Sequence, residues 1–255
     1  MKIHSCVALL FALLLPAWAV PATPPELAEE EEVSNALTVG AGTDLVSRYV
    51  TRGVAAGEGA ALQTGAWLSG RNLTLSVWNN MPLTRADGRG RVDEWDTVLA
   101  WERPWREMTL ELAAARFTYP DQPDTPGTTE AALTLSRSFG PYEAYALNIV
   151  DLDAAPGAWM IELGASRAWE LTPRLGLEAS ASVLWGNRRF HEYNAGAALR
   201  GVGAVGAGLG LPLDIGHGLR LRPHLEWIEL PDGRIREAVG DRRYLTFGIA
   251  LETAD

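Results

Sequence analysis

The stretch Thr43–Gly53, which reads TDLVSRYVTRG, joins a strand pattern to a loop pattern and decides the fold. In its first half apolar and polar residues alternate, so that Leu45 falls on one face and Asp44 on the other. The chain then passes Arg52-Gly53 and a run of small residues, and a second alternating run begins near Ala61. Alternation with a period of two indicates a β-strand with one apolar and one polar face. The stretch therefore predicts a strand, a loop and a second strand.

The same alternation recurs along the chain, and helical periodicity is nearly absent. Twelve runs are predicted to be strands: 36–50, 60–69, 72–81, 92–103, 107–118, 128–139, 142–150, 158–170, 174–186, 192–213, 219–227 and 244–251. The range 192–213 could hold two short strands or one long one. It keeps a single phase, which a hairpin would normally shift, so we predict one long strand there.

The predicted connections alternate between short turns and longer loops. Short turns fall near 70–71, 104–106, 140–141, 171–173 and 214–216, and longer loops near 52–59, 82–91, 119–127, 151–157, 187–191 and 229–241. This alternation is typical of outer-membrane barrels, which have short periplasmic turns and long external loops. We therefore predict an all-β fold over 36–255, a transmembrane antiparallel up-and-down β-barrel of about twelve strands.

Strand length and tryptophan placement favour the same fold. Most of the runs span ten to thirteen residues, which matches the ~9–11 needed to cross a bilayer at a tilt and exceeds the ~5–6 of a soluble strand. Trp95 and Trp101 bracket one apolar strand face, and Trp159 and Trp169 bracket another, as in the aromatic girdles of membrane barrels. The alternative is that these tryptophans pack in the core of a soluble barrel.

The beginning of the chain predicts export. Lys2 and the apolar run Val7–Leu15 are followed by small residues, which is typical of a cleaved signal peptide over 1–22. Residues 23–35 form an acidic, proline-containing segment that we interpret as a periplasmic lead-in. Cys6 is the only cysteine and precedes the apolar run, so the mature protein has no thiol and no disulfide.

Charge and motifs exclude several kinds of site. Without Lys2 the basic residues are all arginine, and the chain carries 32 acidic residues, so its surface does not suit nucleic acid. The spacing of Gly201, Gly203 and Gly206 matches a dinucleotide motif, but strand alternation follows it where a helix is required. The loop acids match no calcium-loop spacing. We predict no metal and no cofactor.

The polar strand faces would surround the lumen of the barrel. Acidic residues outnumber basic ones there, which predicts a water-filled pore that prefers cations. The alternative is that these charges pair across the lumen and plug it. The predicted pore-lining residues are Asp44, Arg48, Glu94, Asp96, Glu102, Glu111, Glu130, Glu162, Glu178, Arg200, Arg220, Arg222, His224 and Glu226.

The pattern Ser47-x-Tyr49-x-x-Arg52-Gly53, followed by a Gln/Gly/Trp strand and by Ser76–Asn80, resembles the TorF-type porin family of Gram-negative outer membranes. The resemblance is strongest over the first third of the mature chain. It implies an outer-membrane location among lipid and lipopolysaccharide, assembly by the barrel-assembly machinery, and passive diffusion of small hydrophilic solutes. We expect Ser47, Tyr49, Arg52 and Gly53 to shape the first external loop or pore mouth rather than catalyse a reaction. The chain departs from many outer-membrane barrels in ending on the polar residues Glu252–Asp255 instead of an aromatic residue.

Two other function classes stay open. A closed structural or surface barrel would show the same strands without conductance. A barrel enzyme acting on outer-membrane lipids would need a serine activated by a histidine, and His191, His217 and His224 have no His-x-Ser sequence beside them. We predict that the protein is not an enzyme.

Overall fold

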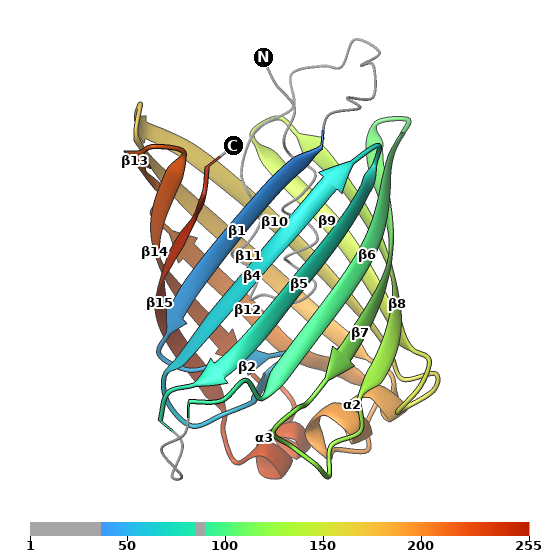
Figure 1. Cartoon of the computed structure of the whole chain (residues 1–255). Helices are drawn as coiled ribbons and strands as arrows, with labels where there is room; N and C mark the ends of the chain where they lie inside the picture. The colour runs from blue at the N-terminus through green and yellow to red at the C-terminus, as the bar shows by residue number, and fades with distance from the viewer. Residues whose placement is uncertain (1–36, 85–89, 255) are drawn as a thin grey trace.

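Alternating side chains build twelve long strands that pair in order into a closed antiparallel barrel (Figure 1). The computed structural model describes residues 37–84 and 90–254. The barrel strands are β1 Thr38–Val46, β4 Ala61–Gly70, β5 Leu73–Pro82, β6 Glu94–Trp105, β7 Met108–Thr118, β8 Thr128–Phe139, β9 Tyr142–Asp151, β10 Trp159–Thr172, β11 Leu175–Gly186, β12 Gly201–Gly210, β14 Leu219–Glu229 and β15 Arg243–Thr253. β1 pairs with β15 from Gly42 to Val46 and closes the barrel. The predicted fold and strand count are confirmed.

The two faces of the strands have the polarity of a membrane barrel. On β15 the outward side chains Leu245 and Phe247 are 63% and 64% exposed, whereas the inward Tyr244 is 4% exposed. Trp95 and Trp159 are likewise on the outward face. A soluble barrel would bury these side chains. The alternative of a soluble tryptophan core is therefore wrong.

Short turns gather at one rim, where both ends of the described chain also lie (Figure 1). Arg71 and Asn72 connect β4 to β5 with φ of 53° and 66°, the pair of positive values of a type I′ hairpin turn. Before β14 the short strand β13, Leu213–Gly216, makes a small hairpin. Its turn lies at His217-Gly218, slightly later than the predicted 214–216.

The prediction of one long strand over 192–213 is wrong in its first half. Helix α2, Arg188–Ala195, occupies this part of the chain, and β12 begins only at Gly201. The Asn187 side chain caps α2 by accepting a hydrogen bond of 2.8 Å from the Phe190 N–H, and Gly196 ends the helix with a φ of 68°. β12 alone crosses the barrel here, so the count of twelve still holds. Gly201, Gly203 and Gly206 lie within strand β12, so the motif is not followed by the helix whose N-terminus would bind the phosphates of a dinucleotide.

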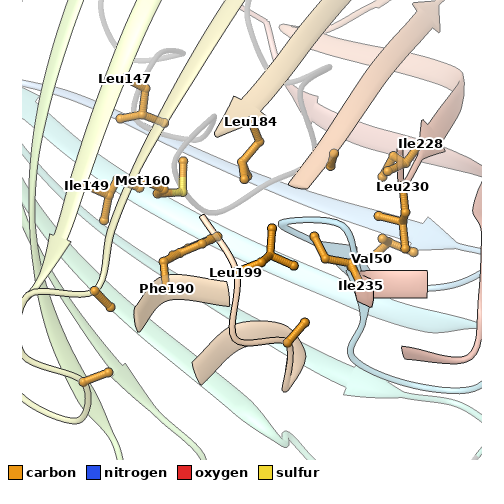
Figure 2. Close-up of a cluster of buried hydrophobic side chains, with 14 of the residues drawn as sticks. Val50, Leu147, Ile149, Met160, Leu184, Phe190, Leu199, Ile228, Leu230 and Ile235 are labelled. Carbon is orange, nitrogen blue, oxygen red and sulfur yellow. The ribbon is translucent and has the colours of Figure 1, made fainter. Parts of the chain in front are cut away.

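The long loops lie across the other rim (Figure 1). They carry α2, helix α3 at Gly233–Val239, and the small hairpin of β2 Val50–Thr51 and β3 Val54–Ala55. Their buried apolar side chains meet apolar side chains on the inner faces of the strands (Figure 2). We call this set the apolar cap: Val50, Phe190, Leu199, Leu230 and Ile235 from the loops, and Leu147, Ile149, Met160, Leu184 and Ile228 from the strands.

Neither the predicted signal peptide, 1–22, nor the lead-in, 23–35, falls within the described residues. No helix within 37–84 and 90–254 combines the length and apolarity needed to cross a membrane.

Candidate functional site

The inner wall of the barrel carries most of the residues predicted to line a pore. They share the strand phase that faces inward, opposite the exposed apolar residues. The inward set is Asp44, Glu94, Asp96, Glu102, Glu111, Glu130, Glu162, Glu178, Arg220, Arg222, His224 and Glu226. Acidic side chains outnumber basic ones on this wall, as the sequence predicts.

Arg48 and Arg200 do not line the lumen, and this part of the prediction is wrong. Arg48 follows the end of β1, where its guanidinium lies 3.8 Å from the Asp241 carboxylate in the β14–β15 loop. Arg200 lies between α2 and β12, is exposed, and stacks 5.0 Å from the Trp185 ring. Neither residue lies in a barrel strand, because β1 ends at Val46 and β12 begins at Gly201.

Toward the short-turn rim, charged side chains pair between neighbouring strands and across an intervening strand. Arg222 of β14 lies 3.5 Å from Glu178 of β11 and 3.6 Å from Glu252 of β15. β12 runs between Arg222 and Glu178. Gly210 on β12 leaves space for their contact, because a Cβ at this position would lie 3.1 Å from the Glu178 carboxylate. These pairs support part of the alternative in which lumen charges neutralise one another.

A second contact of this kind joins His224 to Asp44. The His224 Nε2 atom lies 3.1 and 3.2 Å from the two Asp44 oxygens. Gly248 of β15 lies between them, and a Cβ on it would come within 2.4 Å of the His224 ring. Glycine at this position therefore permits a contact that any side chain would block.

Histidine contacts bear on the catalytic alternative. His224 Nε2 faces the Asp44 carboxylate, and His191 Nε2 lies 3.0 Å from the Gly201 carbonyl oxygen. These contacts favour a structural role for both rings. Within the described parts of the chain, no three His, Cys, Asp or Glu side chains are arranged to hold a metal ion.

Toward the long-loop rim, the loop after β1 folds into the barrel. Ser47 continues the β1–β15 pairing through its N–H to the Phe247 carbonyl at 2.8 Å, and its hydroxyl accepts from the Phe247 N–H at 3.1 Å. The Tyr49 ring is buried with its centroid 5.5 Å from that of Trp78 on β5. Burial raises the pKa of the Tyr49 phenol well above its usual value, and the Glu94 and Asp96 carboxylates add to this rise.

Arg52 extends from the same loop to the opposite wall. Its two terminal nitrogens donate to the two Glu130 oxygens at 2.7 and 2.6 Å, and its guanidinium lies 5.7 Å from the Phe117 ring centroid. Burial alone would lower the pKa of Arg52, but the charge and hydrogen bonds of Glu130 hold it above its usual value. A two-pronged Arg–carboxylate contact is among the strongest hydrogen-bonded pairs in proteins.

The next residue must be glycine. Gly53 has a φ of 80°, and a Cβ on it would lie 3.0 Å from both Ala204 and Leu230. The residues of the predicted family motif thus have separate positions: Ser47 extends the sheet, Tyr49 packs on Trp78, and Arg52-Gly53 turns against the wall.

We give the name acidic cluster to three buried carboxyl groups near Arg52: Glu130, which accepts its two hydrogen bonds, and Glu94 and Asp96 of β6. All three are less than 9% exposed, and Asp96 is 1% exposed. Burial raises the pKa of the nearby Tyr119 phenol, Glu94 and Asp96 raise it further, and Arg52 opposes them.

Two features of this end of the barrel are not predicted from the sequence. The sequence predicts Arg52 in a loop and Glu130 on the lumen face, but it does not predict the contact between them. The apolar cap is the second feature. A signal for the cap was present on β9, whose inward positions include Leu147 and Ile149 beside Tyr145, where a water-filled lumen would favour polar residues.

Comparisons with known proteins identify the fold. No family model and no curated protein matches the sequence, so the TorF-type assignment stays a prediction. Among solved structures, the NanC porin superposes with a TM-score of 0.52 at 8% identity, covering 86% of this chain and 100% of that one. The KdgM porin superposes with a TM-score of 0.52 at 5% identity, covering 85% of this chain and 99% of that one. The KdgM porin in complex with disordered oligogalacturonate gives the same TM-score and identity, covering 86% of this chain and 99% of that one. The chain therefore has the β-barrel fold of outer-membrane porins.

Proposed function

We propose that this protein is a porin-like channel of the outer membrane, through which small hydrophilic solutes or ions diffuse passively. The observation that carries the proposal is the reversed polarity of the closed barrel, with apolar side chains outward and polar side chains along the inner wall. Such a wall suits water and dissolved solutes. The shared fold with the NanC and KdgM porins supports it.

The inner wall near β11 and β12 has the smallest side chains. Ser180 and Ser182 face Gly208 and Gly206, and both serines are partly exposed. Glycine and serine at inward positions leave room in the lumen. A hydrophilic path along this wall is the route we propose for solutes.

Cation preference is a further part of the proposal. Acidic side chains outnumber basic ones along the inner wall. A ring of carboxylates lowers the energy of a cation in a narrow pore and raises that of an anion. Membership of the TorF-type family, export by a signal peptide, and assembly among lipopolysaccharide also belong to the proposal and rest on the sequence.

Osmotic swelling of liposomes tests the proposal. Refolded protein in liposomes should let a neutral monosaccharide enter, so that the vesicles swell at a rate proportional to the amount of protein, whereas a large dextran should stay outside. Vesicles that contain correctly inserted barrel but do not swell in any small solute would contradict the proposal.

The non-conducting structural barrel is the second candidate, and the apolar cap favours it. Leu230 and Ile235 are 0% and 2% exposed, so the loops pack closely on the strand ends (Figure 2). The two candidates differ in whether this cap separates from the strands in the membrane. The swelling experiment distinguishes them directly.

A further inference from the structure

The contact between Arg52 and Glu130 has the chemistry of a binding site for a guanidinium group. The carboxylate accepts both hydrogen bonds of the planar group, at 2.6 and 2.7 Å, and the Phe117 ring lies 5.7 Å from the cation. Guanidinium groups are recognised by paired carboxylate oxygens and by aromatic rings in this way. In this structure the group comes from the chain itself.

Arg52 reaches the site from a small two-stranded hairpin. β2 and β3 pair through only two residues each, Val50 with Ala55 and Thr51 with Val54. Arg52 lies at their turn with a φ of 52°, a left-handed conformation that is unfavourable for a non-glycine residue. Non-glycine residues keep such a conformation only where surrounding contacts hold it. Here Arg52 gains those contacts from Glu130 and from Asn194, whose side chain donates to the Arg52 carbonyl at 3.3 Å.

The acidic cluster holds more carboxyl groups than Arg52 pairs with. Glu94 and Asp96 of β6 lie near Arg52 and Tyr119. The Asp96 Oδ1 atom is buried without a hydrogen-bond partner among the described residues. Buried carboxylate oxygens are normally hydrogen-bonded, so this atom points to a donor that arrives from outside the chain.

We propose that the acidic cluster is a binding site for solutes that carry a guanidinium group, and that Arg52 occupies it when no such solute is present. This inference rests on the proposed channel function and names the solute class for the same lumen. A solute guanidinium replaces that of Arg52 on Glu130 with the same two hydrogen bonds and the same charge. The exchange removes the polar contact that Arg52 makes between the β2–β3 hairpin and the wall.

Binding of free guanidinium ion to an emptied site is the first test. In detergent-solubilised protein, Arg52→Ala should bind guanidinium about tenfold more tightly than the wild type, in which Arg52 competes. Low-millimolar guanidinium should also restore the heat resistance that the variant loses. Urea, which is planar and similar in size but neutral, is the matched control and should do neither.

The double variant Arg52→Ala/Glu130→Gln locates the site. It should neither bind guanidinium nor gain heat resistance from it. If Arg52→Ala does not fold, Arg52→Gln removes the charge with a smaller change in volume and carries the same test. Equal responses to guanidinium and urea, or equal binding by the single and double variants, would overturn the proposal.

Uptake by wild-type protein in liposomes tests the solute class. Arginine should enter about tenfold faster than lysine, which has the same charge, and faster than citrulline, which has the same length but a neutral urea group. Glu130→Gln should abolish the difference between arginine and lysine. Equal uptake of arginine and lysine overturns the guanidinium site while leaving the channel intact. Absence of uptake of every solute contradicts the channel function itself. Guanidinium binding to Arg52→Ala in detergent does not depend on transport, so it tests the site independently.

Discussion

At the scale of single residues, glycines on the inner wall determine where large lumen side chains lie. Gly164 on β10 lies under the Tyr145 ring of β9, where an added Cβ would come within 2.4 Å of that ring. The position of the ring lets the Tyr145 hydroxyl donate to Glu162 at 2.6 Å. Gly210 and Gly248 serve neighbouring polar contacts in the same way.

Gly164→Ala should therefore displace Tyr145 and break its hydrogen bond to Glu162. We expect the free energy of unfolding to fall by about 1–3 kcal/mol, the usual cost of overpacking, measured by urea unfolding of the protein in lipid vesicles. Gly57→Ala is the matched control, because no atom lies within 4 Å of its added Cβ. Equal losses for the two variants would contradict this account of Tyr145.

At the scale of elements, the apolar cap joins two short helices to the strand ends. Ile235 is the buried residue of α3, and its neighbours in the cap come from separate loops and strands. Ile235→Ala should leave a cavity that weakens the packed state by about 2–5 kcal/mol. The cap should then separate from the strands more often, so the fraction of time that a single channel is open should rise.

Glu237→Ala is the control for this change, since Glu237 lies exposed on the same helix. It should leave the open fraction unchanged. If Ile235→Ala leaves the open fraction at the wild-type value, the cap does not limit passage through the barrel.

The cap should also respond to pH through His191 on α2. Burial lowers the pKa of this imidazole, while its contact with Gly201 and the charge of Asp232 oppose the shift. Asp232 itself stays charged, because the Arg234 side chain and N–H lower the pKa of Asp232 to about 2. The packed cap therefore favours neutral His191, and this contribution is present above the unfolded-state pKa of ~6.5.

The contribution of neutral His191 to the stability of the packed cap is lost as the pH falls through the lowered pKa of His191 in the packed state. Acidification below about pH 6.5 should accordingly raise the open fraction of single channels. His191→Gln, which keeps a polar side chain without a titrating ring, should show a flatter pH profile. The same profile in both proteins would mean that His191 is not the responding group.

The elements also show what could be predicted from the sequence. Each barrel strand faces two environments, so alternation appears locally and the strands were predictable. In 192–199 the apolar residues have another cause. Ala197 and Leu199 are buried in the segment after α2, where they pack in the same core cluster as the apolar cap, whereas Tyr193 is exposed on α2. The Arg52–Glu130 pair joins residues 78 apart in the chain, and no local pattern records the path of the loop that brings them together.

At the scale of the whole molecule, the outward apolar surface requires a membrane. Phe247 is 64% exposed on β15, and Phe247→Arg should destabilise the barrel in lipid by about 2–4 kcal/mol if the residue lies near the bilayer midplane. Glu237→Arg, at an exposed loop helix, should have little effect. Unfolding in lipid vesicles measures both. A neutral effect of Phe247→Arg would indicate that this surface does not face lipid.

The central claim is that the polar interior of this barrel conducts. Single-channel recording of the refolded protein in a planar bilayer, with a salt gradient across it, tests that claim most directly. Our account predicts discrete conductance steps and a reversal potential of the sign that shows cation preference, because acidic side chains outnumber basic ones along the inner wall. Discrete steps with anion preference would contradict the role of the acidic inner wall. A fully inserted barrel that remains silent at all voltages would contradict the channel itself.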